Sequence, residues 1–245
     1  MRPALHRFVP AAALAALASA SLGAALAQAP DLAQAEREVL ERGNTFRQSQ
    51  GVAALAPNTA LAAAAKNLAA YMARSDRYGH DADGRVPAQR AQAEGYDYCM
   101  VAENIALQYR STDFESAELA AHFVQGWIDS PGHRGNLLDA SATDTGVAIA
   151  RSAGSGRYYA VQMFGRPAAL RVRFEIDNRS STALNYQLGE QRYALDPGVT
   201  RRHTECEAPA LRLTLPGRAT TTLQPVDGAR YRIEGSGGRL RLREG

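Results

Sequence analysis

The chain has 245 residues, of which 28 are basic and 25 acidic, giving a formal net charge of +3. Residues 30–245 alone hold 26 basic and 25 acidic groups. This near balance argues against a nucleic-acid-binding protein and against dependence on an anionic membrane surface, because such proteins concentrate positive charge. The length fits one or two domains.

The first 29 residues have the features of a signal peptide. Arg2 and Arg7 form a short basic start, residues 8–26 are apolar and rich in alanine, and Ala27-Gln28-Ala29 has the small-x-small pattern of a cleavage site. The alternative is an uncleaved anchor, although no stop-transfer charges follow the stretch. We therefore expect a secreted or periplasmic protein with no transmembrane segment after cleavage.

Residues 30–167 combine helical periodicity with two strands near the end. Apolar residues recur at helical spacing in 32–50, 59–74 and 116–129, and Pro87 is placed to open a short helix over 87–96. Segments 146–152 and 157–165 read as strands joined by a Gly-Ser turn. The stretch IDSPGHRGN, residues 128–136, follows a helix and reads as a tight turn that carries His133.

Residues 168–245 have a different pattern, in which apolar and polar residues alternate strictly. The alternation covers 170–176, 184–188, 211–215, 231–234 and 240–243, with Gly, Pro and Asn in the turns between. We expect about six short strands with one buried face, and thus an α+β chain whose second domain is all β. This region holds 13 arginines and 9 acids. Outward arginines usually form a solvated face that discourages edge aggregation, and binding of a polyanion or cell-wall partner is the alternative.

Two cysteines, Cys99 and Cys206, lie in the segment expected to be exported. An oxidising compartment favours a disulfide between them, and two buried free thiols are the alternative. The bond would join the two regions and would brace the segment around Glu103.

The polar residues that could carry chemistry in the first region are His80, Glu103 and His133. Glu103 stands in the apolar frame Ala-Glu-Asn-Ile-Ala, and a carboxylate buried there requires partners. Two histidines and a glutamate would suit a divalent metal such as zinc, or general acid–base work. His122 lies within a helix and is expected to be a surface or packing residue.

Two further motifs are incomplete. Ser130 with His133 could form a nucleophile and base, but the G-x-S-x-G elbow is absent and no acid orients the pair. Residues 81–84 match only a fragment of a calcium loop. No catalytic residue is established; Glu103 would be the candidate in an enzyme, and Asp129, Ser130, Arg134 and Asn136 are candidate supporting residues.

An ordered set of short motifs resembles the bacterial branch of the CAP superfamily, also called SCP-like domains, which is named for cysteine-rich secretory proteins, antigen 5 and plant pathogenesis-related proteins. The set covers about residues 33–166. It comprises Asn44-Thr45-Phe46-Arg47 with the segment 51–61, Tyr78-Gly79-His80 with Asp83-Gly84, Arg90 with Gly95-Tyr96, Glu103-Asn104-Ile105-Ala106, Trp127-Ile128-Asp129-Ser130-Pro131-Gly132-His133-Arg134-Gly135-Asn136-Leu137-Leu138 and Thr145-Gly146-Val147-Ala148.

The resemblance implies an α-β-α sandwich with a central antiparallel sheet and a cleft lined by two histidines and two acids. His80, Glu103 and His133 would be three of these four residues. The eukaryotic pattern W-x-x-E is broken, because Ser130 stands at the glutamate position and Asp129 is one residue away. No cofactor is established by the sequence, and zinc or another divalent cation is the candidate.

We therefore expect a signal peptide over 1–29, a CAP domain over 30–167 and a β module over 168–245. The favoured hypothesis is a non-catalytic module that binds a small molecule, lipid or peptide in the cleft. The alternative is a metal-assisted hydrolase of peptides or cell-wall material, with Glu103 as base. A third possibility is that the β module binds a cell-wall or extracellular partner. No nucleic-acid partner is expected.

Overall fold

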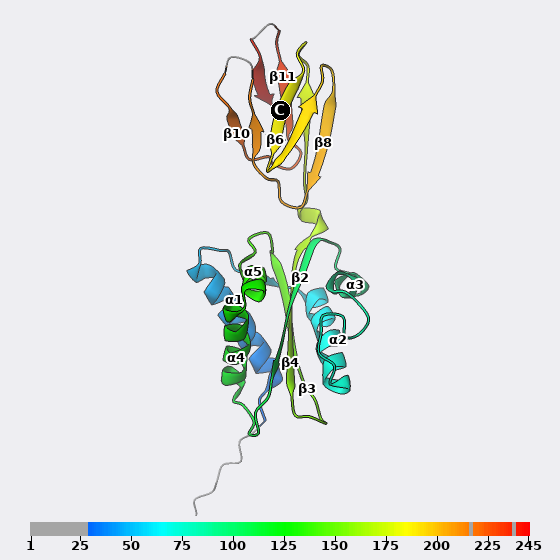
Figure 1. Ribbon diagram of the computed structural model, residues 1–245, viewed down its shortest axis with the longest axis vertical. Coiled ribbons are helices and arrows are strands. Elements are labelled where there is room, and N and C mark those ends of the chain that lie inside the picture. Colours follow the sequence, from blue (N-terminus) through cyan, green and yellow to red (C-terminus); the bar gives the residue numbers. More distant parts are fainter. Residues whose placement is uncertain (1–28, 216–217, 237–238) are drawn as a thin grey trace, which may run out of the picture.

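The computed structural model describes residues 29–215, 218–236 and 239–245. All but the last residue of the expected signal peptide therefore lies outside the described part of the chain. No helix within these residues is long and apolar enough to cross a membrane. A layered α-β-α region is followed by an all-β region (Figure 1), which confirms the α+β class and the CAP-type sandwich expected from the sequence.

A four-stranded sheet forms the middle layer of the first region, in the order β1-β3-β4-β2. Strand β4 pairs with both β2 and β3 in antiparallel fashion, whereas the two-residue β1 pairs with β3 in parallel. The sheet is thus antiparallel except at this short edge, and β2 forms its opposite edge. The strands are β1 (Ala56–Pro57), β2 (Tyr98–Gln108), β3 (Asp144–Arg151) and β4 (Tyr158–Pro167).

Five helices cover the two faces of this sheet (Figure 1). One apolar core lies beneath α1 and α4 and contains Phe123, Trp127 and Phe164, and a second lies beneath α2 and contains Leu68 and Val161. Because alternate residues of β4 point to opposite faces, this strand is buried on both. The helices are α1 (Leu32–Ser49), α2 (Thr59–Ser75), α3 (Pro87–Ala93), α4 (Ser116–Asp129) and α5 (Pro131–Leu138).

Helix α2 begins and packs as its sequence dictates. The side chain of Asn58 accepts hydrogen bonds from the backbone nitrogens of Ala60 and Leu61, which satisfies two of the free donors at the helix start. The alanine-rich helix then lies so close to β3 that a Cβ at Gly146 would overlap the backbone of Ala62. Only glycine fits at this crossing.

Two elements differ from the expectations. Residues 131–138 form helix α5, so the interpretation of this stretch as a simple turn is wrong. Pro131 is compatible with the first helical position because that residue needs no amide donor, while the extended backbone of Ser130 separates α4 from α5. No element is predicted from the sequence for the segment around Glu103, and the structure has the 11-residue strand β2 there.

The second region consists of two four-stranded sheets with an apolar core between them (Figure 1). The orders are β10-β9-β6-β7 and β12-β11-β5-β8, so there are eight strands where about six were expected. Both sheets contribute to the core, with Phe174 and Ile233 from one and Tyr186 and Leu213 from the other. After η1 (Ala168–Leu170), the strands are β5 (Val172–Asn178), β6 (Leu184–Leu188), β7 (Gln191–Leu195), β8 (Thr200–Glu205), β9 (Leu211–Leu213), β10 (Thr221–Leu223), β11 (Arg230–Glu234) and β12 (Arg241–Glu244).

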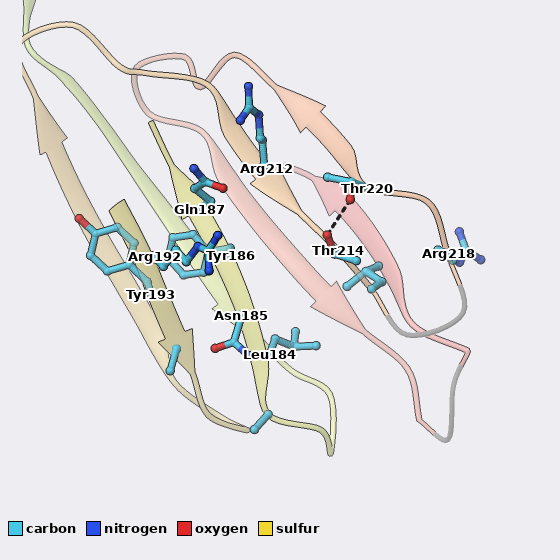
Figure 2. Close-up of a pocket in the computed structure, with 13 residues that line it drawn as sticks. Leu184, Asn185, Tyr186, Gln187, Arg192, Tyr193, Arg212, Thr214, Arg218 and Thr220 are labelled. Carbon is cyan, nitrogen blue, oxygen red and sulfur yellow. Dashed lines mark hydrogen bonds between the residues drawn. The ribbon is translucent and has the colours of Figure 1, made fainter. Parts of the chain in front are cut away.

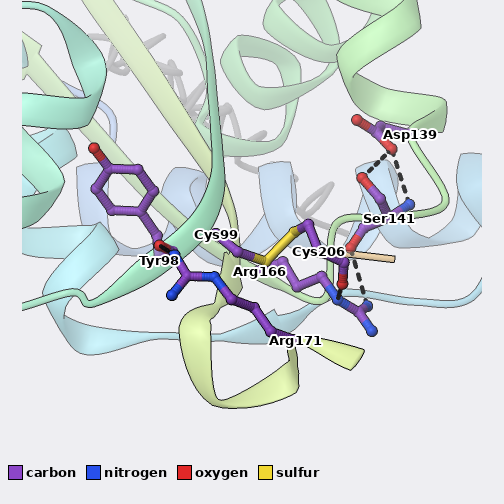
Figure 3. Close-up of a disulfide and its surroundings, with 7 residues drawn as sticks. All are labelled: Tyr98, Cys99, Asp139, Ser141, Arg166, Arg171 and Cys206. Atoms are coloured by element: carbon purple, nitrogen blue, oxygen red, sulfur yellow. Dashed lines mark hydrogen bonds between the residues drawn. A yellow bond between two sulfur atoms is a disulfide. The ribbon is translucent and has the colours of Figure 1, made fainter. Parts of the chain in front are cut away.

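A disulfide joins the two regions, as expected from the sequence (Figure 3). It links Cys99 in β2 with Cys206, which follows β8, and the two Cα atoms lie 5.4 Å apart. Arg166 supports the junction, because its Nε donates to the carbonyl of Cys206 at 2.9 Å. Arg171 donates to the carbonyl of Tyr98 at 2.9 Å. The start of the edge strand β2 is therefore tied covalently and by hydrogen bonds to the second region.

Candidate functional site

The candidate site lies at the edge strand β2, where side chains from both helical layers meet. Glu103 is on the face of β2 that carries α2 and α3, and its side chain is only 1% exposed. Its Oε2 accepts from Nη2 of Arg90 at 2.7 Å, and its Oε1 lies 2.8 Å from Nδ1 of His80. The buried carboxylate thus has one partner at each oxygen, as its burial requires.

Arg90 is the residue that organises this side of the site. Helix α3 carries it, and its guanidinium donates to Asp83 at 2.8 Å, to the carbonyl of His80 at 2.8 Å and to the carbonyl of Arg85, in addition to Glu103. One arginine therefore ties the loop before α3 to the edge strand. No role for Arg90 was expected from the sequence, although a buried Glu103 already called for a cationic partner.

His133 approaches from the other layer, in helix α5. Its ring centroid lies 6.5 Å from that of His80, with 45° between the ring planes. The carbonyl of His133 accepts from Nδ2 of Asn104, and Asn136 donates to Oδ1 of Asn104 at 2.9 Å and to the carbonyl of Glu103 at 3.2 Å. Asn104 is fully buried on the opposite face of β2 from Glu103. These amides fix α5, and with it His133, against the edge strand.

The outward carbonyl of Ile105 is also covered from both layers. Nε1 of Trp127 in α4 donates to it at 3.0 Å, and the hydroxyl of Tyr78 donates to it at 3.2 Å. An edge strand normally leaves such groups free to pair with another chain. Here Trp127, Tyr78 and Asn136 occupy them, so the edge supports the two histidines instead of offering a strand-pairing surface.

The two histidines differ in how far they are buried. Burial, and then the charge of nearby His80, lower the pKa of His133 below its usual value. The neutral form of His133 is therefore favoured. The side chain of His80 is 49% exposed, so one imidazole faces solvent while the other is half-buried beside it.

The other candidate residues lie apart from this group. Asp129 is exposed at the end of α4 and accepts from Gln125 at 2.8 Å. The guanidinium of Arg134 lies 5.7 Å from the centre of the Phe46 ring, on the α1 side. Of the supporting residues named from the sequence, only Asn136 contacts the site directly, while Ser130 is the residue between α4 and α5. His122 is exposed near Glu118, where a surface residue was expected.

The residues present do not fit a metal site with three protein ligands. Structural zinc sites use four ligands and catalytic sites use three plus water. The described residues contain no group of three His, Cys, Asp or Glu side chains placed to hold a metal ion. Only His80 and His133 are available, because Glu103 is engaged by Arg90, whose positive charge opposes a cation nearby. His80 and His133 instead present two imidazole rings beside the edge strand β2.

Comparisons with known proteins agree with this architecture. The model of the cysteine-rich secretory protein family, CAP, matches residues 40–164. The uncharacterized protein YkwD of Bacillus subtilis is 27% identical over 132 residues, which cover 54% of this chain and 47% of YkwD. The chain therefore spans about half the length of this relative.

Two solved structures are among those similar to this chain. An outer surface protein from Borrelia burgdorferi has a TM-score of 0.50 and 17% identity, over 57% of this chain and 98% of that one. An extracellular protein containing a SCP domain from Bacillus anthracis has a TM-score of 0.46 and 26% identity, over 54% of this chain and 40% of that one.

Proposed function

The chain belongs to the cysteine-rich secretory protein (CAP) family, and from this premise we propose that it is an exported, non-catalytic binding protein. Its ligand would be a small molecule, lipid or peptide held at His80, Glu103 and His133. Export is supported by the signal-peptide features of residues 1–29 and by the Cys99–Cys206 disulfide, since such bonds persist in oxidising compartments.

One observation carries the proposal: both oxygens of Glu103 are used inside the protein, by Arg90 and by His80. A general base must reach a proton on the substrate or on water. Glu103 is 1% exposed and fixed beside a guanidinium, so it is poorly placed for that task. Its better role is to orient His80, as carboxylates commonly do for functional imidazoles.

The orientation of His80 indicates which ligand groups it can accept. When a neutral His80 donates through Nδ1 to Glu103, its Nε2 accepts from a ligand hydroxyl or amide N–H; when the ring is protonated, Nε2 donates to a ligand oxygen. In its neutral form, which the lowered pKa favours, His133 offers one donor and one acceptor. A lipid headgroup hydroxyl or a peptide bond can pair with the donors and acceptors of these two imidazoles.

Histidine-ring NMR of the purified protein tests binding at this place. Fatty acids, a sterol and short peptides are added in turn, and a true ligand is expected to shift the ring signals of His80 and His133. His122 and His203 lie elsewhere and serve as internal controls. Loss of the effect in His80→Gln and His133→Gln supports the proposal. A ligand that leaves both signals unmoved would place binding elsewhere.

The metal and hydrolase hypotheses are tested separately. Zinc is titrated by calorimetry into the wild type, His80→Ala and His133→Ala; equal binding in all three removes the metal site. Peptides and peptidoglycan are then offered as substrates. Turnover that disappears in Glu103→Gln, with the fold intact by circular dichroism, would favour the metal-assisted hydrolase over the binding protein.

A further inference from the structure

The two outward faces of the second region differ in whether carboxylates neutralise their arginines. On the sheet β12-β11-β5-β8, Glu175 pairs with Arg202 at 2.7 Å and with Arg230 at 2.6 Å. On the same sheet, Arg243 pairs with Glu234 at 3.1 Å. Much of the positive charge of this face is therefore neutralised by carboxylates within the protein.

The opposite sheet, β10-β9-β6-β7, carries a groove of ≈ 1070 Å³ (Figure 2). Three arginines line it and no acidic residue does: Arg192 from β7, Arg212 from β9 and Arg218 from the segment after β9. Within the described residues, none of the three has a carboxylate at ion-pair distance, and all three are exposed. Three arginines without a carboxylate partner, from three segments of the chain, therefore line one groove.

Strand register places these groups in rows. Gln187 of β6 is the cross-strand partner of Arg192 on one side and of Arg212 on the other. The two arginines are therefore two strands apart, about 10 Å, with an amide between them. The adjacent row is uncharged and lies beside them in Figure 2: it contains Asn185, Thr214 and Thr220, with the two threonine hydroxyls 2.7 Å apart.

We propose that this groove binds an acidic polysaccharide. Guanidinium groups bind carboxylates with two parallel hydrogen bonds, so Arg192 and Arg212 would each hold one acid group of the polysaccharide chain. The amides and hydroxyls of the adjacent row are donors and acceptors suited to sugar hydroxyls. The site lies on the second region and is independent of the His80 and His133 site.

Polygalacturonate is the probe for this groove, because its methyl-esterified form keeps the sugar backbone and removes the charge. Calorimetry at physiological ionic strength, where the Debye length is about 8 Å, is carried out on the purified protein with its disulfide intact. We expect the wild type to bind the acid form and not the ester. The double variant Arg192→Gln with Arg212→Gln should weaken binding by roughly tenfold or more, the size expected for lost charge-assisted hydrogen bonds.

A matched variant separates this site from general charge attraction. Arg202→Gln with Arg243→Gln removes the same charge from the opposite sheet and should leave binding within about twofold, because long-range surface charges are screened. Arg192→Lys with Arg212→Lys should bind at an intermediate level. Equal loss in the two glutamine variants, no binding by the wild type, or tighter binding of a single-stranded oligonucleotide than of polygalacturonate would each overturn the proposal.

Discussion

Arg90 and Glu103 form an ion pair in which both side chains are only 1% exposed, with 2.7 Å between Nη2 and Oε2. The pair joins helix α3 to the edge strand β2 and holds the acid that orients His80. A buried pair of this kind adds little stability relative to apolar residues, but removing one partner leaves an uncompensated buried charge. The pair is therefore a sensitive point of both the fold and the candidate site.

Arg90→Met is expected to lower the free energy of unfolding by about 3–5 kcal/mol, because Glu103 would lose its cationic partner while remaining buried. Chemical denaturation monitored by circular dichroism measures the change. Adding Glu103→Gln to the variant should cost less than the sum of the two single changes, since the residues are directly coupled.

The exposed pair of Arg42 and Glu38 supplies the control for this prediction. These residues lie one turn apart on α1 at 3.1 Å. Arg42→Ala should change stability by no more than about 0.5 kcal/mol, as is usual for surface pairs. If Arg90→Met is as mild as Arg42→Ala, Glu103 is not held as a buried charge by Arg90.

Stability is expected to fall on acidification, because of His203. Burial, and then the charge of Arg201, lower the pKa of this histidine, although Glu205 lies 3.7 Å from its Nδ1. The unfolded chain has a histidine pKa near 6.5. Between that value and the lower folded value, the unfolded state binds more protons, so unfolding becomes easier as the pH falls. His133 shifts in the same direction.

Thermal unfolding at pH 7.5 and pH 5.0 measures this effect. His203→Gln should lose stability at both values, since it loses the contact with Tyr186, and should show a smaller difference between the two. The exposed His122 gives the matched control, and His122→Gln should keep the wild-type difference. A wild type that is equally stable at both values would contradict a lowered pKa of His203.

Removing the disulfide is expected to destabilise the chain substantially. The bond spans 107 positions of sequence. On the loop-entropy model, closing a loop of this size is worth about 4–5 kcal/mol. Cys99→Ser with Cys206→Ser should therefore melt at a lower temperature. A reductant should lower the melting temperature of the wild type and leave that of the variant unchanged; equal responses would argue that the bond is not formed in the protein measured.

The helices were predicted well from the sequence, because the residue pattern that indicates a helix lies within the helix itself. The apolar spacing of Leu119, Phe123 and Trp127 indicates α4, and the bounds expected for it, 116–129, are those observed. The cysteine pairing also followed from simple reasoning, since only two cysteines were available in a segment expected to be exported. The eight strands of the second region were undercounted because short exposed strands such as β10, with Thr221 and Thr222, lack alternation.

The site depends on contacts that sequence spacing does not contain. The rings of His80 and His133 lie near each other because the loop before α3 and helix α5 lie on opposite sides of the edge strand. The sequence pattern did not predict this strand, β2. Arg90 belongs to the ordered set of motifs, and the burial of Glu103 calls for partners, but nothing in the sequence spacing shows that these two residues meet. For Asp129 the sequence suggested a role, because the residue is next to Ser130. In the structure its carboxylate instead accepts a hydrogen bond from Gln125.

The contact of Gly146 with helix α2 gives a test of the layered fold itself. A Cβ at this position would overlap the backbone nitrogen of Ala62, which no side-chain rotation can relieve. Gly146→Ala is therefore expected to destabilise the protein by about 1–3 kcal/mol or more, because the helix must move off the strand. Gly126 in α4 is the matched control, since a Cβ there meets nothing within 4 Å. Gly126→Ala should raise stability by up to about 1 kcal/mol, through the higher helix propensity of alanine. Denaturant unfolding of the two variants compares them directly, and equal effects of the two substitutions would contradict the close packing of α2 on β3.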